Sequence, residues 1–485
     1  MSKTNKKMIL NSNKNNIVLN QNEVKMDSNM SLNLTLSKVQ LLEKCKELGI
    51  TKCSSKTKPQ LIELINNKNM VISETVISKT ISEENVVISE SANEEQGQLR
   101  FIDLFCGIGG FHQALSKLGA KCVLACDIDK DCRTVYKDNY GLEPVSNIKE
   151  IDEKTMPDFD VLCGGFPCQS FSNGGKKLCF EDDRGLLFDE IVRIARVKKP
   201  KFMFLENVKH ILKVSNGKVI DYIKQKIASI GYTLKLFQIS PHNYGIPQQR
   251  ERVYFVCVRN DIYNGNEIVL PTYSGKLEFT KFLDKKEEID PKYFIKDDTL
   301  KVLEVWDEMI KHFEVGEKIS PTIMMNDAFK QYSQSEFDAF PDWKRDYITK
   351  NKPLIQKYYS QFIDWYNKNT AILQKKEIYG KLEWQTGLIK NQDSIFNHFI
   401  QIRQSGIRVK KGNYFPTLVA ISQIPIYGKE KRYITPRECA RLQSFPETFK
   451  LPKEDKKSYK QLGNSVNVDN VFTVISSTLK NYSLV

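Results

Sequence analysis

Long apolar runs and paired cysteines are both missing from this sequence. No stretch of its 485 residues approaches the roughly 18 consecutive apolar residues of a membrane span, and its start, MSKTNKKMIL, is polar and basic. The 11 cysteines are an odd number, without the CxxC pairs of a zinc site or the even count of a disulfide framework. We therefore expect an intracellular, cytoplasmic protein without a signal peptide or transmembrane segment.

One group of cysteines lies close together in the sequence. Cys122, Cys126 and Cys132 have His112 nearby, and this combination of residues could bind a metal ion. Cys122 and Cys126, however, fall on an expected buried strand, where cysteine packs as a small core residue. We therefore expect no metal site.

Positive charge is what the sequence has in excess. Its 73 Lys and Arg against 59 Asp and Glu give a formal charge of +14. This charge suits a polyanionic partner such as nucleic acid, although basic tails without a specific purpose produce the same balance. With 40% hydrophobic residues, the chain can bury a sizeable core and has room for two or three domains.

The first 98 residues differ in composition from the rest. Residues 1–30 are rich in Asn, Lys and Ser, and 71–98 repeat VISE-like units, so both indicate tail and linker. Between them, apolar spacing over 35–66 predicts two short helices, the first ending at Gly49 and the second opening at Pro59. Their apolar positions are Val39, Leu42 and Cys45, then Leu61, Leu64 and Ile65.

This predicted hairpin resembles a SAP module, a small helix-loop-helix that binds DNA. Lys52, Lys56 and Lys58 would lie in its connecting loop. A helical hairpin without a binding role is the alternative interpretation.

From Arg100 onward, apolar runs of strand length alternate with helical spacing, which is typical of a parallel sheet covered by helices. Phe111, Ala114 and Leu115 begin such a helical pattern, which Gly119 ends. We therefore predict a doubly wound α/β domain over about 99–260. Its strands are RFIDLF, KCVLAC, FDVLCG, KFMFLEN, YTLKLFQI and RVYFVCV.

After about residue 262 the chain is rich in Lys and aromatic residues without clear strand alternation, until a motif-bearing pattern resumes near Arg403. This change predicts a separate, inserted domain. Its stretch KRDYITKNKPLIQKYYSQFIDWYNK interleaves basic and aromatic residues. That pattern is typical both of a nucleic-acid surface and of a solvated amphipathic helix.

A glycine-rich turn follows the first predicted strand. In FIDLFCGIGG, glycines precede a helix, and the absence of side chains there lets a ligand lie against the backbone. Asp127 ends the next strand, where a carboxylate can accept both hydroxyls of a ribose. His112 stands where a dinucleotide site would have another glycine, so the spacing favours S-adenosylmethionine over NAD. A tight turn without any ligand is the alternative.

Three further segments place reactive side chains where predicted strands end or begin. Cys168 lies in the loop of DVLCGGFPCQSFSNGG, and a thiol with a pKa of about 8.5 needs cationic or amide neighbours to become a nucleophile. KFMFLEN ends in Glu206 and Asn207, where burial can keep the carboxyl group of Glu206 partly protonated as a proton donor. Arg250 and Arg252 are two residues apart and face one side, where arginine can anchor a phosphate or a base.

These four segments, in this order, resemble the DNA (cytosine-5) methyltransferase family, as do PRECARLQSFP at 436–446 and QLGNSVNVDN at 461–470. The resemblance covers about half of the chain. It implies a Rossmann-like methyltransferase domain at 99–261 and 433–485, with a target-recognition domain inserted at 262–432. It also implies S-adenosylmethionine as methyl donor, double-stranded DNA as substrate, a monomer, and a restriction endonuclease acting on the same site as a partner.

The resemblance also implies roles for individual residues. Cys168 would attack the cytosine, Glu206 would contact and protonate it, and Arg252 with Arg250 would orient it. Asn147 departs from the family pattern, which has Asp there, but its side-chain oxygen can still accept a hydrogen bond from adenine. The implied cofactor residues are Phe105, Gly107, Gly109, Asp127, Ile128, Asn147, Ile148, Phe166, Pro167, Asn464, Ser465 and Val466.

Other functions compete with this interpretation. A family branch that methylates transfer RNA carries a Cys-Phe-Thr signature after its inserted region, and this sequence lacks it. A catalytically inactive DNA-binding relative would not need the intact Cys168, Glu206 and Arg252. We therefore expect the modification enzyme of a restriction-modification system, with a viral or solitary enzyme as the alternative.

Overall fold

The computed structural model describes residues 37–48, 50–51, 53–62, 64–65, 98–167, 186–387, 389–390, 393–420 and 423–484. The chain divides into two units, Met1–Glu94 and Glu95–Val485. No helix in these described ranges is long and apolar enough to cross a membrane.

The first unit contains the predicted pair of helices. Helix α2 (Lys38–Glu47) begins with a capping box at Ser37, and residues 58–62 and 64–65 are also helical. Leu41 and Cys45 are fully buried, whereas Val39 is 68% exposed, so the prediction of Val39 as a core position is wrong. Positions four apart stay on one face of a helix, whereas a repeated spacing of three drifts around it. Gly49 and Lys52 lie outside the described residues.

The second unit contains the six strands predicted from Arg100 onward, in the order β2-β1-β3-β4-β6-β5. Strands β2, β1, β3 and β4 are parallel, but β6 runs antiparallel to both β4 and β5. The expectation of a wholly parallel sheet is therefore wrong for β6. The link from β5 to β6 holds only the short helix η4 (Pro241–Tyr244), and a parallel return needs a longer crossover. The strands are β1 (Arg100–Leu104), β2 (Lys121–Cys126), β3 (Val161–Gly164), β4 (Phe202–Val208), β5 (Tyr232–Ile239) and β6 (Arg252–Arg259).

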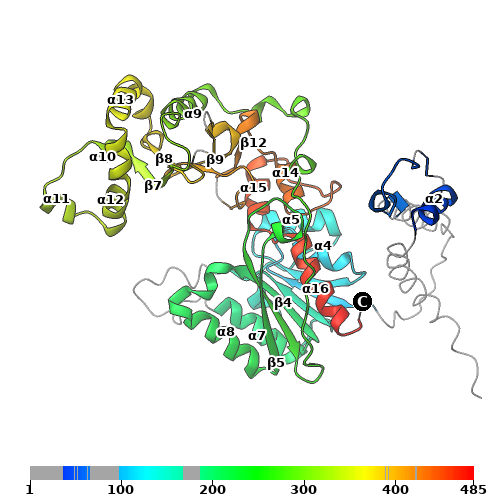
Figure 1. Ribbon diagram of the computed structural model, residues 1–485. Coiled ribbons are helices and arrows are strands. Elements are labelled where there is room, and N and C mark those ends of the chain that lie inside the picture. Colours follow the sequence, from blue (N-terminus) through cyan, green and yellow to red (C-terminus); the bar gives the residue numbers. More distant parts are fainter. Residues whose placement is uncertain are drawn as a thin grey trace, which may run out of the picture. The chain divides into compact units, whose positions relative to one another are not determined.

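Helices cover both faces of this sheet, as the doubly wound pattern predicts (Figure 1). Phe101 and Phe204 pack on one face with α4 (Gly110–Ser116), α5 (Lys130–Tyr140) and α16 (Val468–Asn481). Their neighbours Ile102 and Leu205 pack on the other face with α7 (Leu186–Lys198) and α8 (Lys218–Ser229). Alternate residues of one strand thus enter two cores. We call this part of the unit the first lobe.

A second six-stranded sheet, in the order β12-β11-β9-β10-β8-β7, forms the second lobe. Helices α9 (Asp297–Ile310) and α13 (Tyr359–Leu373) pack on one of its faces through Trp306 and Trp365. The basic and aromatic stretch forms α12 (Asp342–Lys357) and α13, and Phe362 is buried, as in an amphipathic helix. The strands are β7 (Ile319–Met324), β8 (Lys381–Trp384), β9 (Phe399–Arg403), β10 (Gly406–Lys410), β11 (Ile426–Tyr427) and β12 (Arg432–Tyr433).

A buried ion pair joins the lobes where the chain returns from the second to the first. Arg432 on β12 donates from Nη1 and Nη2 to the two carboxylate oxygens of Glu438 on α14 (Pro436–Leu442), at 2.9 and 2.8 Å. Both side chains are fully buried. The same carboxylate accepts the N–H of Asp284 at 2.9 Å and of Thr435 at 2.7 Å. The outgoing and returning segments are therefore tied to one side chain.

Candidate active site

Asp127 holds the glycine-rich turn after β1 in shape. Its Oδ2 accepts the N–H of Gly107 at 2.7 Å and its Oδ1 accepts the N–H of Asp129 at 2.8 Å. Burial raises the pKa of Asp127, and these two N–H groups act in the opposite direction. Gly107 has a φ of 53°, which glycine adopts at little cost. A carboxylate has about four acceptor positions, so Asp127 can fix the turn and still accept hydroxyl groups of a ligand.

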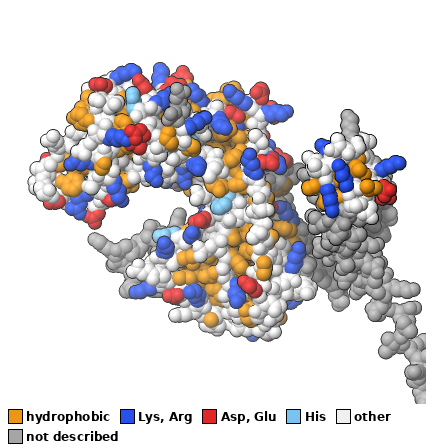
Figure 2. Space-filling model, in the orientation of Figure 1, with side chains coloured by type: hydrophobic (Ala, Val, Ile, Leu, Met, Phe, Trp, Pro, Cys, Tyr) orange, Lys and Arg blue, Asp and Glu red, His pale blue; other side chains and the backbone are white. Residues whose placement is uncertain are grey.

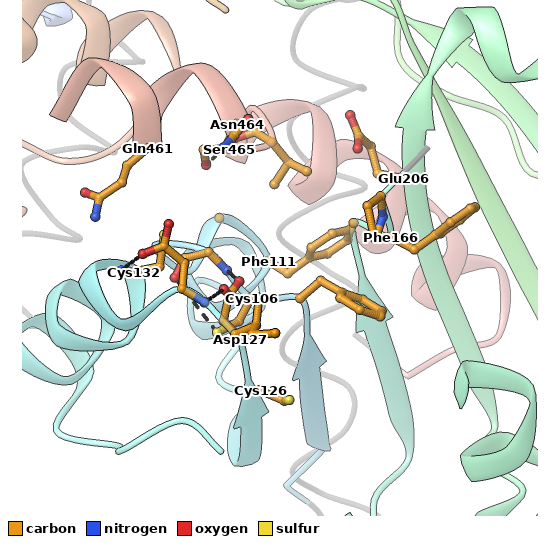
Figure 3. A pocket seen from close by; sticks show the side chains of 18 of the residues that line it. Cys106, Phe111, Cys126, Asp127, Cys132, Phe166, Glu206, Gln461, Asn464 and Ser465 are labelled. Carbon is orange, nitrogen blue, oxygen red and sulfur yellow. Dashed lines mark hydrogen bonds between the residues drawn. The ribbon is translucent and has the colours of Figure 1, made fainter. Parts of the chain in front are cut away.

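A cavity of about 500 Å³ opens beside this turn, a size that holds a small-molecule ligand. In Figure 3, Asp127 lies at one end of it and Glu206 at the other. Segments that are far apart in the sequence meet here, as the motifs predict. The predicted site residues that line the cavity are Phe105, Gly107, Asp127, Ile128, Asn147, Ile148, Phe166, Pro167, Glu206, Arg250, Arg252, Asn464, Ser465 and Val466.

Gly109 is placed differently from the expected cofactor contact, because it is not among the residues that line the cavity. A Cβ atom at this position would lie 2.3 Å from Cε2 of Tyr140, and the φ of Gly109 is 85°. The Tyr140 hydroxyl donates to the carbonyl oxygen of Gly109 at 2.9 Å. Gly109 therefore supports the turn from behind, against the Tyr140 ring.

Ile128 and Asn147 line the part of the cavity near Asp127. The Ile128 side chain is 82% exposed, so it offers an apolar surface that a flat ring could cover. The Asn147 side chain caps a short helix, with Oδ1 accepting the N–H of Lys149 at 3.1 Å and Nδ2 donating to Glu150 at 3.1 Å. Its oxygen retains one acceptor position for a ligand.

The segment after α15 (Asp455–Asn464) covers the glycine-rich turn. Val466 packs so closely on Gly110 that a Cβ there would lie 2.5 Å from its Cγ2. Gln461, which lies on α15, also lines the cavity. It was not singled out as a site residue from the sequence. Its side chain is buried, and neither amide atom has a hydrogen-bond partner among the described residues.

Glu206 and Arg252 form an ion pair at the other end of the cavity. Glu206 lies near the end of β4, and Arg252 opens the antiparallel neighbour β6. Arg252 Nε lies 2.9 Å from Glu206 Oε1. Burial raises the pKa of Glu206, which is only 8% exposed, while Arg252 and then Arg250 act to lower it. The carboxyl group can therefore be protonated more easily than an exposed glutamate, and its position is fixed.

Arg250 faces the same cavity but is bonded to the protein itself. Its guanidinium donates to three backbone carbonyl oxygens, those of Leu418 at 2.6 Å, Gly463 at 3.0 Å and Ser465 at 2.7 Å. Burial and the charge of Arg252 lower its pKa to about 9. Contact with a phosphate or a base would have to compete with these three bonds.

Cys168, the predicted nucleophile, lies outside the described residues. The last described residues before it, Phe166 and Pro167, line the cavity. Asn207 donates from Nδ2 to the carbonyl oxygen of Phe166 at 2.9 Å, so β4 fixes the segment that leads to Cys168. Asn207 had no role in the sequence analysis, although it follows Glu206 directly.

The cysteines near the turn are buried thiols. Cys106, Cys126 and Cys132 line the cavity, and burial raises the pKa of each, to about 12 for Cys126. His112 is half-buried, which lowers its pKa to about 4, and its Nδ1 lies 2.7 Å from the Tyr136 hydroxyl. Among the described residues, no group of three His, Cys, Asp or Glu side chains could hold a metal ion.

Comparison with known proteins identifies the family. The model of C-5 cytosine-specific DNA methylases matches residues 99–480. The chain belongs to this family. It is a DNA (cytosine-5) methyltransferase that uses S-adenosylmethionine, as the motifs predicted.

Two curated relatives show how far the similarity extends. Type II methyltransferase M.HhaI of Haemophilus parahaemolyticus is 33% identical over 371 residues, which cover 76% of this chain and 91% of that protein. Type II methyltransferase M1.ScrFI of Lactococcus lactis subsp. cremoris is 33% identical over 401 residues, 81% of each chain. A solved structure of Entamoeba histolytica methyltransferase EhMeth aligns with a TM-score of 0.47 and 20% identity, over 80% of this chain and 99% of that one.

Proposed function

We propose that this methyltransferase flips a cytosine out of a specific duplex DNA sequence and methylates its carbon 5 through a covalent adduct with Cys168, as a monomer inside the cell. The observation that supports this most is the Glu206–Arg252 pair, which shares one cavity with Asp127 and the glycine-rich turn. A proton donor for a base and a carboxylate for a ribose thus lie at two ends of a single site.

The residues near the turn fit S-adenosylmethionine. We assign Asp127 to its ribose hydroxyls and Ile128 to its adenine ring, because one is a carboxylate and the other an exposed apolar surface in the same cavity. The amide of Gln461, which has no hydrogen-bond partner among the described residues, supplies a further polar contact. When bound, the cofactor supplies an electrophilic methyl group. Further proposed contacts are Phe105, Gly107, Asn147, Ile148, Phe166, Pro167, Asn464, Ser465 and Val466.

The remaining chemistry follows from the base. Carbon 5 of cytosine is a weak nucleophile, so the Cys168 thiolate adds to carbon 6 while Glu206 delivers a proton to the ring nitrogen N3. This addition makes carbon 5 electron-rich enough to accept the methyl group. Loss of the carbon 5 proton, return of the N3 proton and cleavage of the sulfur–carbon bond then restore the ring. Arg252 holds Glu206 in place and orients the base.

These steps need the base outside the duplex, which costs a few kcal/mol of unstacking. We assign the choice of sequence to a target-recognition domain at 262–432, which includes most of the second lobe, and the chemistry to 99–261 and 433–485.

The test incubates the purified chain with labelled S-adenosylmethionine and mixed-sequence DNA, and maps modified cytosines by bisulfite sequencing. We expect methylation within one short sequence, and a blank DNA map beside labelled RNA would contradict the proposal. Cys168→Ser should abolish turnover and covalent trapping on DNA that contains 5-fluorocytosine. Cys53→Ser, in the first unit, is the matched control and should change neither.

The relatives named type II methyltransferases support a role as the modification enzyme of a restriction-modification system. A lysate of the source cells should then cut unmethylated DNA at the mapped site and leave DNA treated with this enzyme intact. Cleavage of both DNAs, or of neither, would contradict this role.

For the helical hairpin of the first unit we propose DNA binding through the exposed Lys56 and the half-buried Lys58. Deleting residues 1–98 should leave methyl transfer intact and weaken DNA affinity most at low salt. Unchanged affinity at every salt concentration would contradict a binding role.

A further inference from the structure

The sheet of the second lobe carries polar and charged side chains on the face opposite α9 and α13. Leu382, Ile400 and Ile407 face these helices and belong to their hydrophobic core. The cross-strand partners Glu383, Gln401 and Arg408 form a row over β8, β9 and β10. Because side chains alternate along a strand, Arg403 and Lys410 lie on the same face as this row. We call these five residues the polar face: Glu383, Gln401, Arg403, Arg408 and Lys410.

The polar face is turned toward the first lobe. Phe399 lies two residues before Gln401 on β9, so its side chain is on the same face of the sheet. It packs with Phe415 in the hydrophobic cluster that contains the core of the first lobe. Beyond β10, the backbone of Phe415 bonds to Pro247 at 2.6 Å and to Gln249 at 3.1 Å. Figure 2 shows that the two lobes enclose a hollow. Duplex DNA with a cytosine in the catalytic cavity would therefore pass this face.

Positive charge on the polar face exceeds what the protein itself neutralises. Arg408 forms an ion pair with Glu383, and the same carboxylate interacts electrostatically with Arg403 and Lys410. Burial and the charge of Arg408 lower the pKa of Arg403 to about 10, and burial also lowers that of Lys410. Nε of Arg403 is buried without a hydrogen-bond partner among the described residues. A buried N–H group without a partner is unfavourable, so the guanidinium of Arg403 favours a ligand that supplies hydrogen-bond acceptors.

Arg408 is the cation whose geometry suits a base. Glu383 is 9% exposed and pairs with Nε of Arg408, and Gln385 donates to the other oxygen of the same carboxylate. The Arg408 side chain is 27% exposed, and the hydrogen bonds found among the described residues leave its two terminal amino groups unoccupied. Arg408 lies on β10, near the centre of the six-stranded sheet. In the major groove, guanine presents O6 and N7 to the planar fork of an arginine.

We propose that Arg408, oriented by Glu383, reads a guanine of the target sequence by donating to its O6 and N7. The inference rests on the proposed role of the second lobe in target recognition. Gln401 and Arg403 flank this contact on the same face.

The test starts from the target sequence mapped with the wild-type enzyme. Each guanine of that sequence is replaced in turn by 7-deazaguanine, which lacks the N7 acceptor, and kcat/KM is measured. At one position we expect the wild type to lose about tenfold or more, in line with the usual discrimination of a bidentate contact. Arg408→Ala should lose at least a similar factor on ordinary DNA and clearly less on the 7-deazaguanine duplex, where only the contact with O6 remains to be lost. Additive losses would overturn the proposal.

Two further variants make the result specific. Arg408→Lys keeps the charge but not the fork, so a loss equal to that of Arg408→Ala indicates base reading, whereas full activity indicates a phosphate contact and overturns the proposal. Arg345→Ala, which removes an arginine paired with Asp342 on α12, is the matched control and should leave kcat/KM unchanged. If the wild type methylates no DNA, the proposed function fails. If it methylates DNA and Arg408→Ala changes nothing, this inference alone fails.

Discussion

Glu438→Ala should destabilise the junction of the two lobes more than any exposed ion pair could. The change removes both oxygens that accept from Arg432, and it leaves the N–H groups of Asp284 and Thr435 without their acceptor. Arg432 remains fully buried, with Glu430 as its other carboxylate partner. Removing one member of a buried pair costs about 3–5 kcal/mol, because the other charge stays desolvated.

Glu447→Ala is the matched control for this variant. Glu447 also accepts two hydrogen bonds from one arginine, Arg441, but its side chain is 61% exposed. Water can replace an exposed partner, so the loss should stay below about 1 kcal/mol. The two variants therefore differ in burial rather than in the kind of bond that is lost.

Urea unfolding followed by tryptophan fluorescence measures both losses in the full chain. The fluorescence signal reports on the second lobe, because this lobe contains all four tryptophans of the chain: Trp306, Trp343, Trp365 and Trp384. We expect a clearly lower midpoint for Glu438→Ala and an almost unchanged midpoint for Glu447→Ala. Equal losses in the two variants would refute the argument that burial of the Arg432–Glu438 pair decides its contribution.

Three other predictions concern the cavity. Gly109→Ala should lower the free energy of unfolding by roughly 1–3 kcal/mol, because the added methyl group clashes with Tyr140, and it should weaken the binding of S-adenosylhomocysteine measured by calorimetry. Gly119 also has a positive φ but has open space around it, so Gly119→Ala should leave this binding unchanged. Gln461→Leu should weaken the same binding by up to about tenfold, and unaltered affinity would remove Gln461 from the site. Because burial raises the pKa of Glu206 above its unfolded value, its favourable contribution to stability is present at low pH and is lost as pH rises through the folded pKa. Glu206→Gln should therefore gain unfolding free energy relative to wild type between pH 4 and pH 8, and a constant difference would contradict this sign.

The first sheet could be predicted from the sequence because each of its strands is a short apolar run between polar segments. The direction of β6 could not, since a strand buried on both faces has the same composition whichever way it runs. The second sheet was not predicted, because β7 and β8 pair with strands far along the chain and such pairing leaves little local pattern. Val39 was misplaced because two faces of one short helix are both partly apolar.

The lining of the cavity was predictable where motif residues lie at or just after the end of a strand, as Glu206 and Asp127 do. Contacts across long sequence separations were not. Arg250 bonds to carbonyl oxygens of Leu418, Gly463 and Ser465, and no local pattern reveals those partners. Gly109 occupies a motif position where a ligand contact was expected. The structure shows a different reason for glycine there, because the Tyr140 ring leaves no room for a side chain.

The bond from Arg250 to Leu418 has a consequence for how such an enzyme can change its target. A main-chain oxygen is present whatever amino acid occupies the position, so substitutions at Leu418 and along its segment leave this attachment chemically unaltered. One cation on the catalytic side could thus anchor many different reading surfaces. New sequence preferences could then evolve by altering side chains alone, without redesign of the joint that aligns them with the reactive centre.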